Sequence, residues 1–262
     1  ASHYYFKILH QFPDPALGSD LVSVNAELLG LDTVADPTPG PGGNDAESTR
    51  PFNIIAAASG SEVVFGSVAH PAGSLYIAGS VLSDRQISLV EGPDTNLDLD
   101  WSALLQTIDG PIGLDLGENG FLKGDLIAGG SNGDVILTAQ DTLTLNGHIL
   151  ADRDILIEAG VIAGVSAAPD SVTISPTAWL RTRTAVSPDP LWPPLMFEQS
   201  VQIDGYNNII VNGPIGSLQT DEPRMAGDVL IDSQNWDILI TEESGWIETG
   251  GRIVLTAANI DI

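Results

Sequence analysis

Residues 133–160 read GDVILTAQDTLTLNGHILADRDILIEAG, and this stretch decides the fold. It holds four short β-rich runs set off by Gly, Asn or Asp, and none reaches the roughly 10 to 12 residues that a helix needs. The apolar residues alternate with a period of two, which places one set on a single face: Val135, Leu137, Leu143, Leu145, Ile149, Ala151, Ile155 and Ile157. The stretch is therefore predicted to be a train of short strands with one buried face.

The same pattern recurs elsewhere in the chain. Residues 74–92, SLYIAGSVLSDRQISLVEG, align with residues 142–160 at a shift of 68 positions, and residues 251–257 echo residues 133–139. Such self-similarity indicates a repeat fold in which each unit buries its apolar face by stacking on its neighbours. With strands as units, the expected repeat is a coil of roughly 20 to 25 residues that advances about 4.8 Å per turn. The predicted fold is an all-β solenoid.

The composition is strongly acidic. Nine basic residues face 35 acidic ones, which gives a formal net charge of −26. Such a surface repels nucleic acid and anionic membranes and favours divalent cations, basic partners or a saline medium. Acidic solvated faces that keep an extracellular protein soluble explain the same composition. The absence of cysteine excludes disulfides and thiol chemistry, and no apolar run approaches the roughly 18 residues of a membrane-spanning helix.

The chain is predicted to have two parts. Residues 1–51 are expected to form an N-terminal cap or docking segment with a loop rich in Pro and Gly at residues 36–50. Residues 52–262 are expected to form the solenoid, with insertions at residues 182–199 and 218–226. The first insertion is predicted to be an interaction loop, because prolines and large apolar side chains crowd it: Leu191, Trp192, Leu195, Met196 and Phe197.

The phrasing GDVxLTAxxxLTLNGxIxAxxDIxIxAG resembles the haemagglutinin-type repeats of filamentous-haemagglutinin-like exoproteins and related giant bacterial surface adhesins. The resemblance covers residues 61–262 apart from the two insertions, and it concerns a repeat style rather than a catalytic motif. It implies a right-handed parallel β-helix, secreted to the cell surface, that serves as an adhesin, filament or stalk. The Asn-Pro-Asn secretion motifs of that family's N-terminal domain are missing here, which leaves the lineage open.

One acidic run has the D-x-N-x-D opening of a calcium loop. The candidate Ca²⁺ ligands are Asp94, Asn96, Asp98 and Asp100. Leu99 and Leu105 stand where an EF-hand has Gly and Glu, so the run is not an EF-hand. On a strand, the last three candidates would face outward, with Leu97, Leu99 and Trp101 inward. Outward carboxylates could hold Ca²⁺ between neighbouring coils, and plain solvated acids are the alternative.

Two dipeptides recur at matching repeat positions. Asp84-Arg85 matches Asp152-Arg153, and Asp154 adds a further carboxylate. At a coil corner these residues would form a charge ladder, each arginine bridging the acids above and below; in an enzyme they would be an acid/base pair. Recurrence favours the structural corner. The Asn-Gly pairs at residues 146–147 and 212–213 also recur, and they are expected to supply the positive φ of tight corners and asparagine hydrogen-bond ladders.

An enzymatic function is weighed because right-handed β-helices include polysaccharide lyases and glycoside hydrolases. A hydrolase needs two or three converging carboxylates, and a lyase needs basic clusters. The chain has only two lysines, Lys7 and Lys123, and its seven arginines are scattered. Trp179, Trp192 and Trp236 suit sugar stacking or packing under a loop, and the four histidines lack metal-ligand spacing and are expected to face solvent. We therefore predict that the chain is not an enzyme.

The sequence predicts a secreted, non-enzymatic structural or adhesive module that stacks head to tail into filaments. The expected assembly ends are Tyr4, Tyr5 and Phe6 at one end and Ile260 and Ile262 at the other. Expected partners are further copies or adjacent modules and cell-surface carbohydrate or protein, without nucleic acid or membrane insertion. The alternatives are a β-helical carbohydrate-active enzyme and a Ca²⁺-dependent carbohydrate-binding module. A cleft of three close carboxylates beside an exposed Trp would mark the first, and Ca²⁺ at Asp98 and Asp100 the second.

Overall fold

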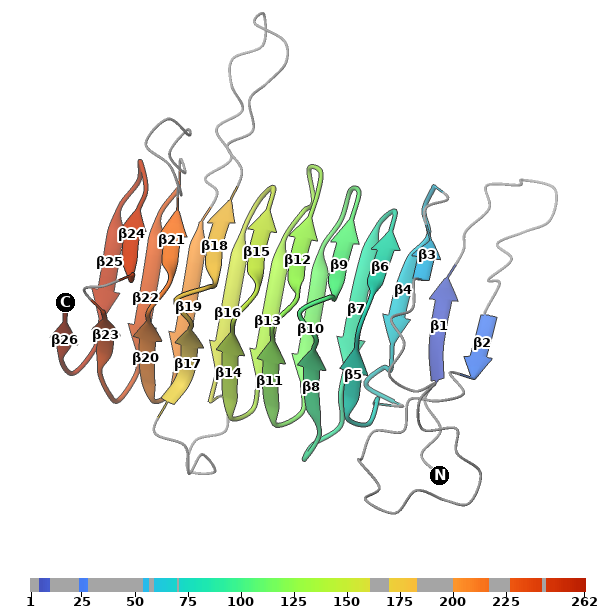
Figure 1. Cartoon of the computed structure of the whole chain (residues 1–262), viewed down its shortest axis with the longest axis horizontal. Helices are drawn as coiled ribbons and strands as arrows, with labels where there is room; N and C mark the ends of the chain where they lie inside the picture. Colours follow the sequence, from blue (N-terminus) through green and yellow to red (C-terminus); the bar gives the residue numbers. More distant parts are fainter. Residues whose placement is uncertain are drawn as a thin grey trace, which may run out of the picture.

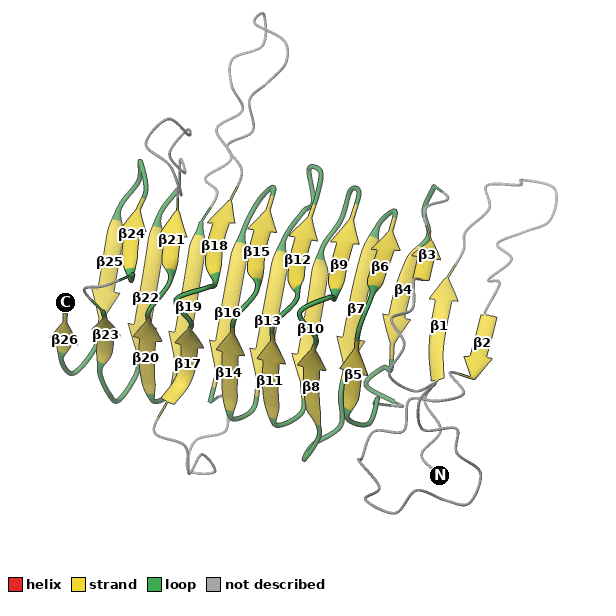
Figure 2. Cartoon of the chain, viewed as in Figure 1, coloured by secondary structure: helices red, strands yellow, loops and turns green. Residues whose placement is uncertain are grey.

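The computed structural model describes residues 5–9, 24–27, 54–56, 59–69, 71–160, 170–182, 200–216, 227–241 and 244–262. All regular elements in this part of the chain are strands, and they lie side by side along one long axis (Figures 1 and 2). No helix among the described residues is long and apolar enough to cross a membrane.

The strands form three sheets. Sheet A has the order β2 (Val24–Glu27), β1 (Tyr5–Leu9), β4 (Glu62–Phe65), β7 (Gln86–Val90), β10 (Ile112–Leu116), β13 (Val135–Ala139), β16 (Ile155–Ala159), β19 (Val201–Gly205), β22 (Val229–Ser233) and β25 (Ile253–Thr256). Sheet B runs from β3 (Ile54–Ala56) through β6 (Ser80–Ser83), β9 (Leu104–Thr107), β12 (Asp125–Ala128), β15 (His148–Ala151), β18 (Trp179–Thr182) and β21 (Pro214–Gly216) to β24 (Trp246–Glu248). Sheet C runs from β5 (Leu75–Ile77) through β8 (Asn96–Leu99), β11 (Asn119–Leu122), β14 (Thr142–Leu145), β17 (Asp170–Ile174), β20 (Asn208–Val211) and β23 (Ile238–Ile240) to β26 (Ile260–Asp261).

Each coil contributes one strand to sheets B, A and C in turn, and neighbouring coils pair in parallel in all three sheets. The fold is a right-handed parallel β-helix, as the sequence predicts. Register partners without an insertion between them lie 20 residues apart at Val135 and Ile155 and 25 apart at Ile87 and Ile112. The 68-residue shift in the sequence spans three coils, because four successive sheet C partners link its ends: Leu75, Leu97, Gly120 and Leu143.

Two strands extend sheet A beyond the first coil. β1 pairs antiparallel with β4, and β2 pairs antiparallel with β1. β2 therefore runs in the same direction as the strands of the coils. Figure 1 shows these two strands at the end of the molecule opposite to the chain's C-terminus.

The core is a column of aliphatic side chains inside the coils. All eight residues that the alternation places inward are at most 2% exposed, whereas Ile136 between them is 38% exposed. The column continues past the sequence insertions, because Ile155 and Val201 are register partners. Burial of each Leu or Ile contributes about 1.5–3 kcal/mol. The stacking of these residues is the main source of the fold's stability.

Small residues occupy the corner between sheets C and B. The residue that precedes each sheet B strand from the second coil onward is Gly or Ala: Gly79, Ala103, Gly124, Gly147, Ala178, Gly213 and Gly245. A Cβ on Gly147 would lie 2.0 Å from the carbonyl oxygen of Gly124 in the coil before it. Gly147 and Gly213 do not have positive φ, so that part of the prediction is wrong. Close approach of the preceding backbone requires these glycines instead.

A polar ladder runs along the first position of the sheet C strands. The Asn119 side-chain amide donates to the Asn96 Oδ1 at 2.9 Å, and the Thr142 hydroxyl donates to the Asn119 Oδ1 at 2.7 Å. Further along, at the residues that precede β23 and β26, the Asn259 amide donates to the Asp237 carboxylate at 2.8 Å. These bonds join successive coils along the axis. The expected asparagine ladder therefore exists, although these rungs lie outside the Asn-Gly pairs. Of those pairs, Asn146 accepts the hydroxyl of Ser175 in the next coil.

Candidate functional site

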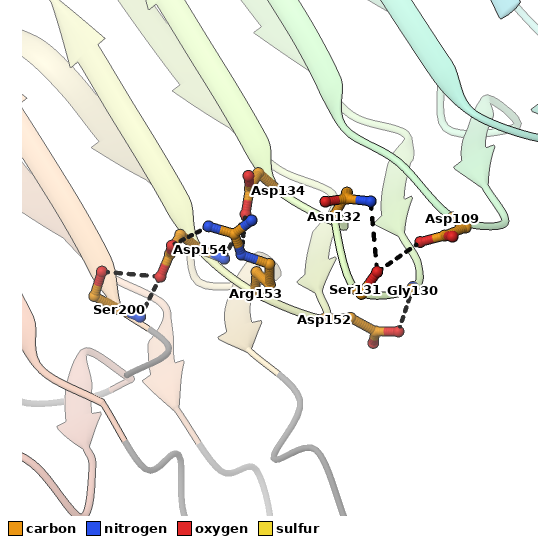
Figure 3. Close-up of polar contacts among 9 residues, drawn as sticks. All are labelled: Asp109, Gly130, Ser131, Asn132, Asp134, Asp152, Arg153, Asp154 and Ser200. Carbon is orange, nitrogen blue, oxygen red and sulfur yellow. Dashed lines mark hydrogen bonds and ion pairs between the residues drawn. The ribbon is translucent and has the colours of Figure 1, made fainter. Parts of the chain in front are cut away.

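The recurrent Asp-Arg dipeptides lie at the corner between sheets B and A, and Figure 3 shows the second of them, Asp152-Arg153. The Asp152 carboxylate accepts the backbone N–H of Gly130, one coil earlier, at 2.8 Å. The Asp84 carboxylate accepts the N–H of Gly60 in the same way at 2.6 Å. Both glycines have positive φ, 82° and 81°. The recurrence therefore marks a corner at which a carboxylate fixes the turn of the preceding coil.

A second set of acids at this corner binds the coil that follows. Asp134 accepts the N–H of Asp154 at 3.1 Å, and Asp154 accepts the N–H and the hydroxyl of Ser200 at 2.7 and 3.1 Å. Asp154 and Ser200 are 46 residues apart in the chain. The Arg153 guanidinium lies between the carboxylates of Asp134 and Asp154, 3.4 and 3.7 Å from them (Figure 3). Arg153 thus bridges Asp134 of the preceding coil and Asp154, its neighbour in the chain. It does not bridge acids of the coils before and after its own.

The same arrangement returns near the C-terminal end. The Asp228 carboxylate accepts the N–H and the guanidinium of Arg252, and these bonds lower the pKa of Asp228. The carboxylates of Asp134, Asp154 and Asp228 are thus occupied by donors from the next coil, and those of Asp84 and Asp152 by donors from the preceding coil. The corner acids therefore act as links between coils, and this occupancy disfavours their use as an acid/base pair.

Three of the predicted calcium ligands lie on the outer face of sheet C. The Lys123 ammonium binds both oxygens of Asp98, at 2.9 and 3.1 Å. The Tyr76 hydroxyl donates to Asp100 at 2.8 Å, and burial followed by this bond raises the pKa of Tyr76 to about 12. The Ser102 N–H and hydroxyl bind the other Asp100 oxygen, and these bonds, the N–H first, lower the pKa of Asp100.

The predicted calcium ligands differ in their positions and partners. Asp94 lies in the turn before β8 with φ 59°, Asn96 is a rung of the polar ladder, and Asp98 already holds a cationic side chain. Within the described ranges, no group of three or more His, Cys, Asp or Glu side chains is arranged to hold a metal ion. Calcium binding at these residues stays a prediction.

Two exposed aromatic residues border this charged cluster. Trp101 follows Asp100 in the next turn and is 63% exposed, so the prediction that it faces inward is wrong. β8 ends at Leu99, and the alternation ends with it. Phe121 is 40% exposed and is the register partner of Asp98. We define the sheet C patch as Tyr76, Asp98, Asp100, Trp101, Phe121 and Lys123. It offers aromatic surface beside hydrogen-bonding groups, a combination that suits sugar rings and amphipathic side chains.

The other singled-out aromatic residues have different surroundings. The His148 ring stacks on Trp179, with the ring centroids 4.7 Å apart, and its Nδ1 lies 3.0 Å from Asp125. His148 is therefore not simply solvent-facing, and one face of the Trp179 indole is covered. Trp236 is 55% exposed in the turn between β22 and β23. Trp192 and the other three histidines lie outside the described residues.

One buried acid, Glu91, was not among the predicted site residues. Glu91 is 6% exposed at the corner between sheets A and C, and it accepts the N–H of Gly117 at 3.2 Å. Burial, which outweighs this bond, raises its pKa to about 7. Leu116 and Ala139 occupy the equivalent buried positions of the next two coils. A polar residue that breaks an inward apolar column is the signal that identifies such a site.

The same corner carries a pocket of about 170 Å³ further along the axis. Its lining comes from three successive coils: Glu158, Ala159, Gly160, Asp204, Gly205, Tyr206 and Gln234. Glu158 and Asp204 are register partners on the outer face of sheet A. These two acids are not predicted as a site from the sequence, because alternation alone does not show which outward acids adjoin a pocket.

The predicted assembly ends differ in their surroundings. Ile260 and Ile262 are 44% and 73% exposed in the last coil. Tyr5 and Phe6 belong to β1, whose backbone pairs with both β2 and β4. Tyr4 lies outside the described residues. So do the five large residues of the predicted interaction loop, and nothing tests that prediction.

Comparisons with protein-family models, with curated proteins and with solved structures found no match to this chain. The likeness to haemagglutinin-type repeats therefore rests on the repeat pattern, and the coarser conclusion, a parallel β-helix, rests on the sheets themselves.

Proposed function

We propose that the chain is an extracellular, non-enzymatic structural or adhesive module. Its β-helix acts as a rod that holds binding surfaces at fixed positions along its length. The observation that carries the proposal is the use of the corner side chains: Asp84, Asp134, Asp152, Asp154 and Asp228 each bind a backbone N–H of a neighbouring coil. These polar groups strengthen cohesion along the axis and do not converge on a reaction centre.

The sheet C patch supports the adhesive part of the proposal. Exposed aromatic side chains provide a large contact area at a small entropic cost. Phe121 is the register partner of Asp98, which binds Lys123, and Trp101 follows Asp100 in the turn after β8. The rigid strands beneath hold these groups in a defined arrangement. Such a surface suits a glycan or a protein surface that presents both apolar and hydrogen-bonding groups.

End-to-end association with adjacent modules or further copies is the second part of the proposal. The inward residues Ile253 and Ile260 of the last coil are 48% and 44% exposed, whereas their partners Val229 and Ile238 are fully buried. An open strand edge with exposed apolar residues favours pairing with another strand. β2 runs in the same direction as β25, which suits head-to-tail pairing through sheet A.

Binding and turnover assays on one sample test the adhesive function against an enzymatic one. Beads coated with the protein are passed over an array of glycans and matrix proteins, and soluble polysaccharides are assayed for released reducing ends or unsaturated products. The proposal predicts retention on at least one surface without product release. Trp101→Ala should reduce retention at least about tenfold, and Trp236→Ala, which removes another exposed indole, should not. Product release, or equal effects of the two variants, would contradict the proposal.

Sedimentation velocity over a range of concentrations tests the association. The proposal predicts species larger than the monomer, and it predicts that their population is lower in the Ile262→Lys variant. Ile108→Lys is the matched control, because Ile108 is 49% exposed in the turn between β9 and β10, away from the ends. A monomer at every concentration would remove this part of the proposal without affecting the adhesive part.

A further inference from the structure

The pocket at the corner of sheets A and C has a polar wall and a small-residue floor. Glu158 and Asp204 stand on adjacent strands, Tyr206 and Gln234 follow in the turns after β19 and β22, and the remaining lining residues are Ala or Gly. Carboxylates accept hydrogen bonds only, and the phenol and the amide both donate and accept. A ligand of this pocket therefore has to supply hydrogen-bond donors.

The electrostatics of the pocket favour a cation. Glu158 and Asp204 are register partners on adjacent strands, which lie about 4.8 Å apart, and like charges directly opposite each other are unfavourable. No lysine or arginine is among the described residues that line the pocket. Asp204 accepts the Gln202 amide at 2.7 Å, a neutral donor, and the Glu158 carboxylate has no hydrogen-bond partner among the described residues. A bound cation would offset this repulsion between the two carboxylates.

The surface beside the pocket selects the kind of cation. Leu156 lies two residues before Glu158 in β16, so both side chains point outward from the same strand. Leu230 occupies the same outward column two coils further on, with Gln202 between the two leucines, and both leucines are partly exposed. An alkyl chain can lie along such leucines while its charged head reaches the acids, which is how lysine side chains bury their stems. A bare metal ion or ammonium gains nothing from the apolar side chain of Leu156.

We propose that this pocket binds an alkyl ammonium group and that its natural source is a lysine side chain of a basic partner protein. The ammonium takes the place between the Glu158 and Asp204 carboxylates, and its methylene stem lies over Leu156. The strongly acidic surface, with a net charge of −26, steers such a partner toward the protein. The site is separate from the sheet C patch and does not depend on the function proposed above.

Titration of the ¹⁵N-labelled chain, followed by NMR, tests the proposal with two matched probes. N-acetyl-lysine amide carries the ammonium, and N-acetyl-norleucine amide has a similar stem without it. The lysine probe should shift the signals of Gly205, Tyr206 and the Gln234 side chain in a saturable way, and the norleucine probe should not. Glu158→Gln should weaken binding at least about tenfold, because one charge-assisted bond is lost. Asp115→Asn removes the same charge from an exposed position of the same outward column, and it should change the affinity for the lysine probe less than about twofold.

Several outcomes would overturn the proposal. If Glu158→Gln and Asp115→Asn weaken binding of the lysine probe equally, the probe is attracted by the overall charge of the protein rather than by the pocket. If only the signals of other residues shift, the probe binds at another site. Binding of the norleucine probe at the same signals would remove the role of the ammonium. A capped trilysine peptide and spermidine, which carry equal charge, distinguish the sources. Tighter binding of spermidine would overturn the assignment to a protein partner.

Discussion

The backbone N–H of Gly130 donates to the carboxylate of Asp152, 2.8 Å away and 22 residues later in the chain. The bond crosses from one coil to the next and holds a glycine with positive φ in its turn. Gly60 and Asp84 repeat this relationship three coils earlier. The recurrent Asp-Arg motif thus fixes the shape of the solenoid.

Removal of this link should weaken the fold. Asp152→Ala leaves the Gly130 N–H without its acceptor, and we expect the free energy of unfolding to fall by about 1–3 kcal/mol. Asp109→Ala is the control, because this exposed acid makes only a 3.4 Å contact with Ser131 (Figure 3). Chemical denaturation measures both. Equal stability of the two variants would show that the carboxylate does not stabilise the corner.

Two glycine substitutions should have opposite outcomes. In Gly147→Ala the new Cβ would meet the Gly124 carbonyl oxygen at 2.0 Å, so the backbone must shift, and we expect a loss of about 3 kcal/mol or more. In Gly113→Ala the new Cβ meets nothing within 4 Å, and stability should stay equal or rise slightly. Thermal unfolding of the two variants provides the comparison. A well-tolerated Gly147→Ala would mean that successive coils do not approach so closely at this corner.

The central hydrogen bonds of the polar ladder should contribute to the stability of the fold. Asn119→Ala removes the donor to Asn96 and the acceptor for Thr142, and we expect a loss of about 1–2 kcal/mol in the free energy of unfolding. Asn132→Ala should change it by less than about 0.5 kcal/mol, because this exposed side chain makes one long contact with Ser131. A denaturation series that ranks Asn132→Ala as the more damaging would refute the ladder's role.

Glu91 should make stability depend on pH near neutrality. Its pKa is raised by burial to about 7 in the folded chain, above the unfolded value of about 4.5, so the folded state binds the proton more tightly. The stabilisation is complete below about pH 4.5 and is lost as the pH rises through about 7. Between pH 5 and pH 8 the wild type should lose about 2–3 kcal/mol more than Glu91→Gln in the free energy of unfolding. Parallel pH profiles of the two proteins would show that the carboxylate is not buried in this way.

The fold followed from the sequence because inward positions leave a clear pattern. Val135, Leu137, Ile155 and Ile157 alternate with outward residues, and a one-residue slip would turn all of them toward solvent. The size of the repeat followed from strand length and spacing. Trp101 was misplaced because alternation says nothing about where a strand ends.

The candidate sites were less accessible to sequence reasoning. Glycine is required at position 147 because the carbonyl oxygen of Gly124, 23 residues earlier, lies too close for a Cβ atom. Only the strand register reveals that contact. The pairing of Asp98 with Lys123 and the pocket beside Glu158 also arise between coils. A local motif search cannot find sites whose members are separated by a full turn of the solenoid.

Disulfide trapping of register partners tests the stacking of coils most directly, because the chain has no cysteine of its own. Leu156 and Gln202 are outward Cα partners on β16 and β19, whereas Ile136 and Gln202 are two coils apart. Oxidation of Leu156→Cys/Gln202→Cys should give an intramolecular disulfide, and Ile136→Cys/Gln202→Cys should stay reduced. A missing bond in the first pair, or equal bonding in both, would contradict the β-helix on which the rod, the patch and the pocket all depend.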